Sequence, residues 1–510
     1  MAAVKLTVAL LLLPAMAAAQ RAPLSAIDWL NEAMKAPQIE VVRPPEDGGQ
    51  ESSFGQETAP ERSLPDGRMK PRARPFTESA LAEAGRDVAP DAIGVLGAEE
   101  TGLPRQLWAH SSPAEAARLI RAVPFDQPAP AQHLFDELML ARSFARLEGE
   151  TIFLARLDAL IARGALDQAQ ALLKVSDVNS QDQFLRAYDI ALLAGDTTEV
   201  CERLREAPGL GENALQKSLC LMRGGDHMMA QQTLIVANAL GTIEEPDVVL
   251  MERFLDPDLF ETGAPIPEAP LTPMRFVLRD ANGLTLPPRL PLPYLYIATG
   301  GDVPPRERML AAERLVAAGA MPPRVLFGMY RAQRPAASGS VWDRSDAIRK
   351  LDQALGFEKD IGPALEETDA LLAPLGLSAA LAREYADRLP EDLTTDTARK
   401  LRLLAGMEDE GEDFLGALSR GADLPDSPRS PLADAIRAGF AEESPEAEGA
   451  EIFAPLLEQG RVGEVILQAL TLLGDAAMPD PGDLTRALWA LRQAGQEDAA
   501  RAIALHYMLT

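Results

Sequence analysis

Apolar residues recur at the spacing of an α-helix along most of the chain, and glycines interrupt this pattern at regular intervals. Gly164, Gly195 and Gly225 are separated by 31 and 30 residues. Each of them follows one apolar helical stretch and precedes another. Around Gly164 the apolar positions are Phe153, Leu154, Leu157, Leu160 and Ile161 before the glycine, and Leu166, Ala169, Leu172 and Leu173 after it. The spacing predicts three tandem helix–turn–helix units over residues 152–240.

The glycines have a physical role in these units, because glycine readily adopts the left-handed conformation that ends a helix. Asp196 and Asp226 follow at once and suit the N-cap of the next helix. Glu199 stands three residues after Asp196, where a capping box has its acidic partner. The same helix–glycine–helix pattern recurs near the C-terminus around Gly495. We therefore predict repeat turns at Gly164, Gly195, Gly225 and Gly495.

A repeat of about 30 residues is typical of an α-solenoid, in which helix pairs too small to bury their own apolar faces stack on neighbouring pairs. The units resemble tetratricopeptide repeats. The alternative is a non-repeating helical bundle. No alternating strand pattern occurs, so the sequence predicts an all-α fold: an α-solenoid of tetratricopeptide-like repeats after a signal peptide and a disordered linker.

The composition changes along the chain and divides it into segments. The predicted segments are a signal peptide (1–19), a short amphipathic helix (20–36), a disordered linker rich in Pro, Gly and Glu (37–76), an N-terminal helical-repeat segment (77–256), a Pro-rich joint (257–293) and a C-terminal helical-repeat segment (294–510). The linker has too few apolar residues to offset the entropy lost on ordering.

Residues 1–19 have the features of a secretory signal. Lys5 gives the N-terminal region its positive charge, and residues 8–13 form a short apolar run. The alanines at 17–19 suit cleavage after Ala19. The alternative is an uncleaved N-terminal anchor. No later stretch approaches the roughly 20 apolar residues of a membrane-spanning helix. We expect a soluble periplasmic or secreted protein without stable membrane insertion.

The chain has two cysteines, Cys201 and Cys220, which flank a predicted turn near residues 208–212. An antiparallel helix pair would bring them side by side, so we predict a disulfide, which suits an exported protein. The alternatives are a metal-binding pair or two buried free thiols. The four histidines show no ligand spacing with these cysteines, so a metal site is disfavoured.

The charge balance narrows the class of partner. The formal net charge is −28, and removal of a leader with one lysine makes it −29. Such an acidic chain disfavours nucleic acid and anionic lipid, and it favours an unidentified protein partner with basic character. The densest acidic run, residues 408–413, lacks the spaced oxygen ligands of a calcium loop.

Catalytic signatures are missing from the sequence. It contains no G-x-S-x-G, H-E-x-x-H, P-loop or dinucleotide-binding motif. Its carboxylates are so numerous that no pair stands out as an acid and base. We therefore predict no catalytic, cofactor-binding or metal-binding residues and expect a protein that is not an enzyme.

Several stretches resemble a family of exported proteins named antifreeze glycopeptide polyprotein-like. The matching stretches are residues 23–30 (PLSAIDWL), 101–104 (TGLP) with Leu107 and Trp108, 164–169 (GALDQA), the cysteine pair, 254–260 (FLDPDLF), 334–339 (RPAASG) and 341–344 (VWDR). They span most of the chain. The resemblance implies export but carries no established activity or site.

Three functions are open at this point. The leading hypothesis is a soluble periplasmic helical-repeat protein that serves as a non-catalytic protein–protein interaction scaffold, because solenoids offer long concave surfaces. The alternative is a cell-envelope, peptidoglycan-related enzyme or its relic, since similar helical superhelices precede lytic transglycosylase domains. The third is ice binding, which is disfavoured because the chain has no tandem Thr-Ala-Ala array and no regular threonine face.

Overall fold

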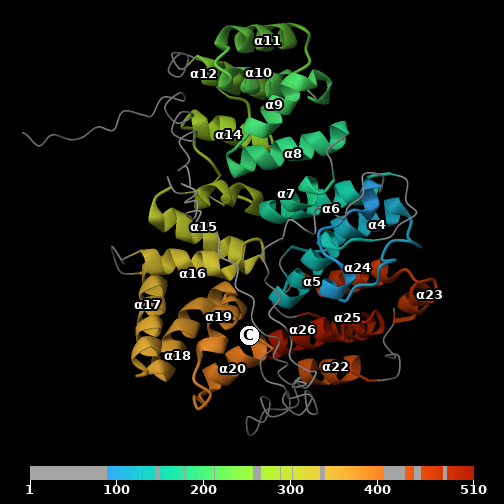
Figure 1. Ribbon diagram of the computed structural model, residues 1–510, viewed down its shortest axis with the longest axis vertical. Coiled ribbons are helices and arrows are strands. Elements are labelled where there is room, and N and C mark those ends of the chain that lie inside the picture. The colour runs from blue at the N-terminus through green and yellow to red at the C-terminus, as the bar shows by residue number, and fades with distance from the viewer. Residues whose placement is uncertain are drawn as a thin grey trace, which may run out of the picture.

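The structure is a computed structural model that describes most of the chain from residue 89 onwards (Figure 1). The described ranges are 89–125, 127–143, 149–176, 180–211, 213–256, 266–287, 289–300, 303–333, 339–406, 431–441, 450–474 and 479–509. The predicted signal peptide (1–19), amphipathic helix (20–36) and linker (37–76) lie outside these ranges.

Helices are the main regular structure in the described ranges, which confirms the predicted all-α class. The first helices are α3 (Ala98–Thr101), α4 (Pro113–Ala122), α5 (Ala129–Leu140) and α6 (Thr151–Ala162), and α4 to α6 lie at middle height on the right of Figure 1. The chain then rises through α7 (Leu166–Lys174), α8 (Gln181–Ala194), α9 (Thr198–Glu206), α10 (Ala214–Arg223) and α11 (His227–Ala239), and returns through α12 (Glu245–Leu255) and α14 (Pro273–Ala281). Successive helices of this rising part contact each other, as stacked pairs do.

Two short 3-10 helices, η3 (Leu292–Leu295) and η4 (Ile297–Thr299), bring the chain back to the centre beside α15. The left-hand column of Figure 1 contains α15 (Pro305–Ala317), α16 (Pro323–Ala332), α17 (Val341–Phe357), α18 (Ile361–Leu372), α19 (Ser378–Tyr385) and α20 (Asp396–Leu404). The lower right contains α22 (Pro431–Gly439), α23 (Phe453–Glu458), α24 (Val462–Leu472), α25 (Pro481–Gln493) and α26 (Glu497–Leu509).

The last helices pack against the first ones. α24 contacts α4 and α5, and α26 contacts α5. A hydrogen bond fixes this closure, because Gln127 Nε2 donates to the carbonyl oxygen of Leu470 at 2.5 Å. A solenoid with contacts only between neighbouring repeats would keep these segments apart. The lower part of the molecule is therefore closed on itself rather than open-ended.

Two apolar cores follow from this arrangement. The lower core collects buried residues from both ends of the described chain, from Ile93 to Ile190 and from Leu295 to Ala504. The upper core lies between Leu166 and Tyr294 and is built mainly by α8 to α14. The first core thus joins residues of the predicted N-terminal (77–256) and C-terminal (294–510) segments.

A fully buried arginine organises the start of the lower core. Arg156 in α6 donates to the carbonyl oxygens of Met139 at 2.5 Å, Ile93 at 2.7 Å and Ala141 at 3.1 Å. Burial lowers the pKa of Arg156 to about 10, which still leaves it charged at neutral pH. One side chain therefore satisfies three buried carbonyl groups and holds Ile93 and the C-terminal end of α5 against α6.

The structure adds helices that the apolar pattern did not reveal. α17, of 17 residues, lies within the predicted C-terminal helical-repeat segment (294–510), but no apolar periodicity marks it as a helix. Its buried side includes Ser345 and Ala347, so its apolar stripe is weak. Within the predicted joint (257–293), α14 packs against α8 and α12 and contributes Phe276 to the upper core.

Candidate interaction surface

The helix α11 lies at the top of the molecule in Figure 1. Two local backbone features determine where α10 ends and α11 begins. Gly225 ends α10 with a φ of 85°, and Asp226 N donates back to Leu221 O at 2.9 Å. The Asp226 side chain then accepts from Met229 N at 3.1 Å, which is the predicted N-cap. On the inner side, Ser218 Oγ in α10 donates to the carbonyl oxygen of α11 residue Ala230.

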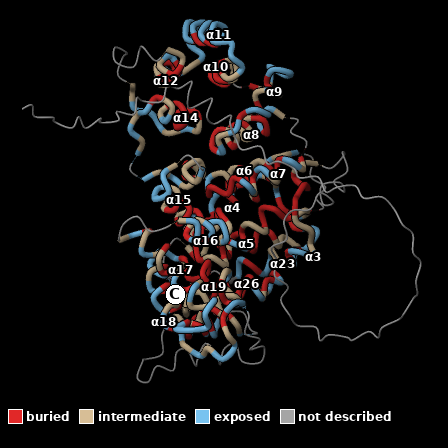
Figure 2. The backbone as a smooth tube through the Cα atoms, turned by 60° about the vertical axis from the view of Figure 1, so that its left-hand side comes forward, coloured by how far each residue is buried: buried red, intermediate tan, exposed pale blue. Residues whose placement is uncertain are grey.

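The helix is apolar on two opposite sides, but only one side is buried. Ala230, Leu234 and Ala237 are at most 5% exposed and form the buried side, where α11 contacts α10 and α12. The opposite side, here called the α11 face, exposes Met228 (70%), Met229 (47%), Ile235 (65%), Val236 (56%) and Leu240 (71%). Figure 2 shows this end of the molecule as largely exposed. Gln231, Gln232 and Asn238 are also exposed on α11, but five large apolar side chains in contact with solvent are more than the outer side of a surface helix usually carries, so the α11 face has the composition of a contact surface.

The α11 face is also free of charge. No Asp, Glu, Lys or Arg occurs between Asp226 and Glu244, although such residues make up 25% of the chain. Leu234 and Ile235 are adjacent apolar residues of the predicted helical pattern, but the structure buries only Leu234. Periodicity cannot identify the core side of a helix that carries large apolar residues on more than one side.

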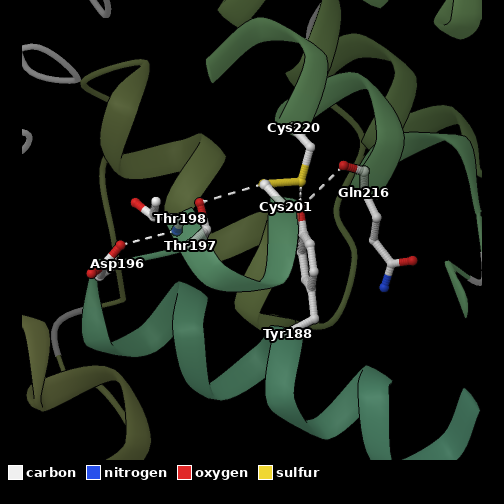
Figure 3. Close-up of a disulfide and its surroundings, with 7 residues drawn as sticks. All are labelled: Tyr188, Asp196, Thr197, Thr198, Cys201, Gln216 and Cys220. Atoms are coloured by element: carbon white, nitrogen blue, oxygen red, sulfur yellow. Dashed lines mark hydrogen bonds between the residues drawn. A yellow bond between two sulfur atoms is a disulfide. The ribbon is translucent and has the colours of Figure 1, made fainter. Parts of the chain in front are cut away.

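The Cys201–Cys220 disulfide, shown in Figure 3, fixes the helices beside α11. It joins α9 to α10 with a Cα–Cα distance of 5.1 Å, which confirms the predicted pairing. The bond closes a segment with a sequence separation of 19 residues. Because α11 packs on α10, the cross-link also limits how far the α11 face can move relative to α8 and α9.

Two hydroxyl groups lie close to the disulfide, one near each sulfur (Figure 3). The Tyr188 hydroxyl donates to the carbonyl oxygen of Gln216 at 3.2 Å and lies 3.7 Å from Cys220 Sγ. Burial raises the pKa of Tyr188, so this group keeps its proton. The Thr197 hydroxyl lies 3.8 Å from Cys201 Sγ. Since a disulfide sulfur carries no hydrogen, Thr197 is the donor there.

The predicted turn glycines all have the left-handed backbone that favours glycine. Their φ angles are 77° at Gly164, 84° at Gly195, 85° at Gly225 and 79° at Gly495. The turns lie in different parts of the molecule and do not form one site. At Gly164 space is restricted as well, because a Cβ would lie 3.0 Å from the carbonyl oxygen of Leu292.

The predicted capping box at Asp196 and Glu199 is wrong. The N-cap of α9 is Thr197, whose side chain makes no capping hydrogen bond. Asp196 instead accepts from Thr198 N at 3.0 Å, and this bond lowers the pKa of the Asp196 carboxyl. The turn between α8 and α9 is one residue longer than the sequence signal suggested.

A buried polar cluster in the lower core was missed by sequence reasoning. Ser378 Oγ donates to Asp369 at 2.7 Å, and Lys400 Nζ donates to the same carboxylate at 2.8 Å. The three residues come from α18, α19 and α20, and no short motif links them. Lys400 Nζ also donates to Ser378 Oγ at 3.3 Å, so each of the three side chains contacts the other two. The cluster therefore ties three helices together.

One small hollow lies among the described residues of the upper core. Its volume is about 20 Å³, space for roughly one water. It lies beside the disulfide-linked helices and is lined by Leu192, Gly195, Thr197, Leu219, Arg223, Phe254 and Val277. In the described ranges no three His, Cys, Asp or Glu side chains are grouped to hold a metal ion. None of the helices described has the length and apolarity needed to cross a membrane.

Comparison with protein-family models, with curated proteins and with solved structures gives no match for the chain. The resemblance to the antifreeze glycopeptide polyprotein-like family therefore stays an expectation. The α11 face is the feature from which a function can be argued.

Proposed function

We propose that the protein is a non-catalytic α-helical interaction scaffold that works outside the cytoplasm and docks a protein surface through the α11 face. The observation that carries this proposal is the exposure of Ile235 (65%) and Leu240 (71%) on an uncharged helix at the end of the molecule. Contiguous apolar surface with a polar surround is typical of interaction sites on soluble proteins. Aliphatic side chains at successive helical turns are typical anchors for helix-mediated docking.

The rigidity of the surroundings supports docking at this face. The α11 helix is capped by Asp226, bonded to α10 through Ser218, and stands next to the disulfide that joins α9 to α10. A surface held in place before binding loses less conformational freedom when it binds. The α11 face therefore suits a stable docking platform better than an adaptable loop would.

The extracytoplasmic location is supported by two features of the chain. Residues 1–19 have the pattern of a cleaved secretory signal, and Cys201 and Cys220 form a disulfide. Expression with this leader in a Gram-negative host, followed by fractionation and intact-mass measurement, tests the location. We expect a periplasmic product that begins at Gln20. An uncleaved product in the cytoplasm would contradict the location without affecting the docking proposal.

Site-specific photo-crosslinking tests the docking itself. A photoreactive amino acid is placed at position 235 of the full-length protein, with a matched position at exposed Glu252 on neighbouring α12. We expect discrete protein adducts from position 235 and none from position 252. A second substitution, Val236→Glu, should remove the adducts by placing a charge in the contact. Equal labelling from both positions, or no adduct from 235, would overturn the proposal.

A further inference from the structure

We infer that the occupant of the α11 face is α11 of a second copy of the chain, packed antiparallel across a two-fold axis. The inference depends on the proposed function, since the same face does the docking. Such an interface is isologous, so one surface must be complementary to itself. The positions of the apolar side chains along α11 meet that condition.

The apolar residues of α11 are distributed evenly about its middle. Positions 229, 233, 236 and 240 are separated by four, three and four residues and hold Met, Thr, Val and Leu. This is the spacing of a seam between two paired helices. In an antiparallel pair, Met229 of one copy faces Leu240 of the other, and Val236 faces Thr233. Met229, Val236 and Leu240 are then covered, while Met228 and Ile235 of the α11 face lie outside the seam.

Charge favours this face over the rest of the surface for self-association. Two chains of net charge −28 repel each other over most approaches. Between Asp226 and Glu244 there is no formal charge, so copies that meet here bring no like charges into the centre of the contact. The flanking acidic residues lie at the rim, where salt screens them. Association through the α11 face should therefore strengthen as the salt concentration rises.

The size of the face sets the expected affinity. One exposed side of a 13-residue helix offers less than the roughly 800 Å² per partner that stable complexes bury. We therefore expect a reversible dimer that populates at high protein concentration. The antiparallel arrangement also places the positive end of each helix dipole beside the negative end of the other.

Sedimentation velocity of the purified, disulfide-intact protein tests the inference across a range of protein and salt concentrations. We expect a monomer–dimer equilibrium that shifts toward dimer with salt. Val236→Glu and Leu240→Glu should each weaken the dimer at least tenfold while circular dichroism stays unchanged. The matched control is Phe357→Glu, which replaces a side chain that is 80% exposed on α17. A monomer at all concentrations, or a dimer that survives both α11 substitutions, would overturn the inference.

Engineered disulfides test the antiparallel geometry. Met229→Cys and Leu240→Cys proteins are mixed and oxidised. We expect the mixed cross-link to form faster than either cross-link between identical variants. Preferred 229–229 and 240–240 cross-links would indicate a parallel pair and overturn the geometry.

The two proposals fail in different ways. If the purified protein is monomeric but position 235 still crosslinks a different protein in cells, the inference of a second copy fails and the docking function stands. If position 235 gives no adduct and the protein is monomeric, both fail. An adduct of twice the chain mass, lost in Val236→Glu, supports both.

Discussion

The indole ring of Trp108 lies so close to the backbone of Gly463 that a Cβ at position 463 would overlap carbon atoms of the ring. Trp108 precedes α4 and is fully buried, while Gly463 stands in the first turn of α24. The contact joins the two ends of the described chain. It indicates that α4, α5, α24 and α26 fold as one unit and that neither end completes the lower core alone.

We expect Gly463→Ala to destabilise the protein, because the added methyl group meets a rigid ring that is packed on all sides. Overpacking of this kind costs about 1–3 kcal/mol. The matched control is Gly328→Ala in α16, where a Cβ would have no heavy atom within 4 Å. There the higher helix propensity of alanine should stabilise by up to about 1 kcal/mol. Urea unfolding measures both, and equal effects of the two substitutions would contradict the tight Trp108 contact.

The Cys201–Cys220 disulfide should stabilise the upper core. Closing a loop of this length is worth roughly 3 kcal/mol on the loop-entropy estimate, which depends on the model of the unfolded state. We expect the Cys201→Ala/Cys220→Ala double variant to melt at a lower temperature, with faster amide exchange in α10 and α11. Reductant should lower the melting temperature of the natural protein and leave the variant unchanged. Similar melting of the natural protein with and without reductant would show that the cross-link has no stabilising role.

Local signals in the sequence were enough to predict the helical class, the four turn glycines and the cysteine pair. Gly195, for example, needs only its own backbone conformation to end α8, with a φ of 84°. Cys201 and Cys220 lie on neighbouring helices of one hairpin, so their separation along the chain already indicated their pairing. Features of this kind depend on residues that are close in sequence.

The closure of the lower core and the exposure of α11 could not be predicted in the same way. An apolar stripe shows that a helix side is buried but does not identify its partner, so nothing near Gln127 indicates that it bonds to Leu470. On α11, Leu234 and Ile235 are neighbours with similar hydrophobicity, yet one is 3% and the other 65% exposed. Only the packing of α10 and α12 decides between them. The candidate site therefore emerged from the structure.

The carboxyl group of Asp136 should make the stability depend on pH. It lies on α5, about 3.8 Å from where a Cβ of Gly319 would be, and burial raises its pKa to about 7 despite nearby Arg163 and Arg383. Between its ordinary value of 3.8 and about 7, the folded protein keeps a proton that the unfolded chain has released. Stability from this group therefore falls as pH rises through that window, by up to about 4 kcal/mol.

Asp136→Asn removes this titration, so the variant should gain stability relative to the natural protein between pH 5 and pH 8. Urea unfolding at both pH values measures the difference. The control is Asp392→Asn, which changes an exposed carboxyl group in the turn before α20. If the stability difference between Asp136→Asn and the natural protein were the same at both pH values, the Asp136 carboxyl would hold no more proton in the folded than in the unfolded state over this range.

Substitutions of Arg156 test whether its side chain holds the first segments of the lower core together. Its guanidinium group donates to three buried carbonyl oxygens, those of Met139, Ile93 and Ala141. Arg156→Met fills similar volume but leaves these acceptors without a donor, and each buried acceptor left unsatisfied costs about 1–3 kcal/mol.

We expect Arg156→Met to shift urea unfolding strongly, or to yield a protein that limited proteolysis cuts near residues 93–96. The comparison variant is Arg118→Met on the exposed side of α4, where the side chain pairs only with Glu115 and its loss should leave unfolding unchanged. Arg156→Lys keeps the charge but offers a single donor atom, so it should fall between the two. Natural stability in Arg156→Met would mean that water satisfies these carbonyl groups and that the buried guanidinium does not hold the segments together.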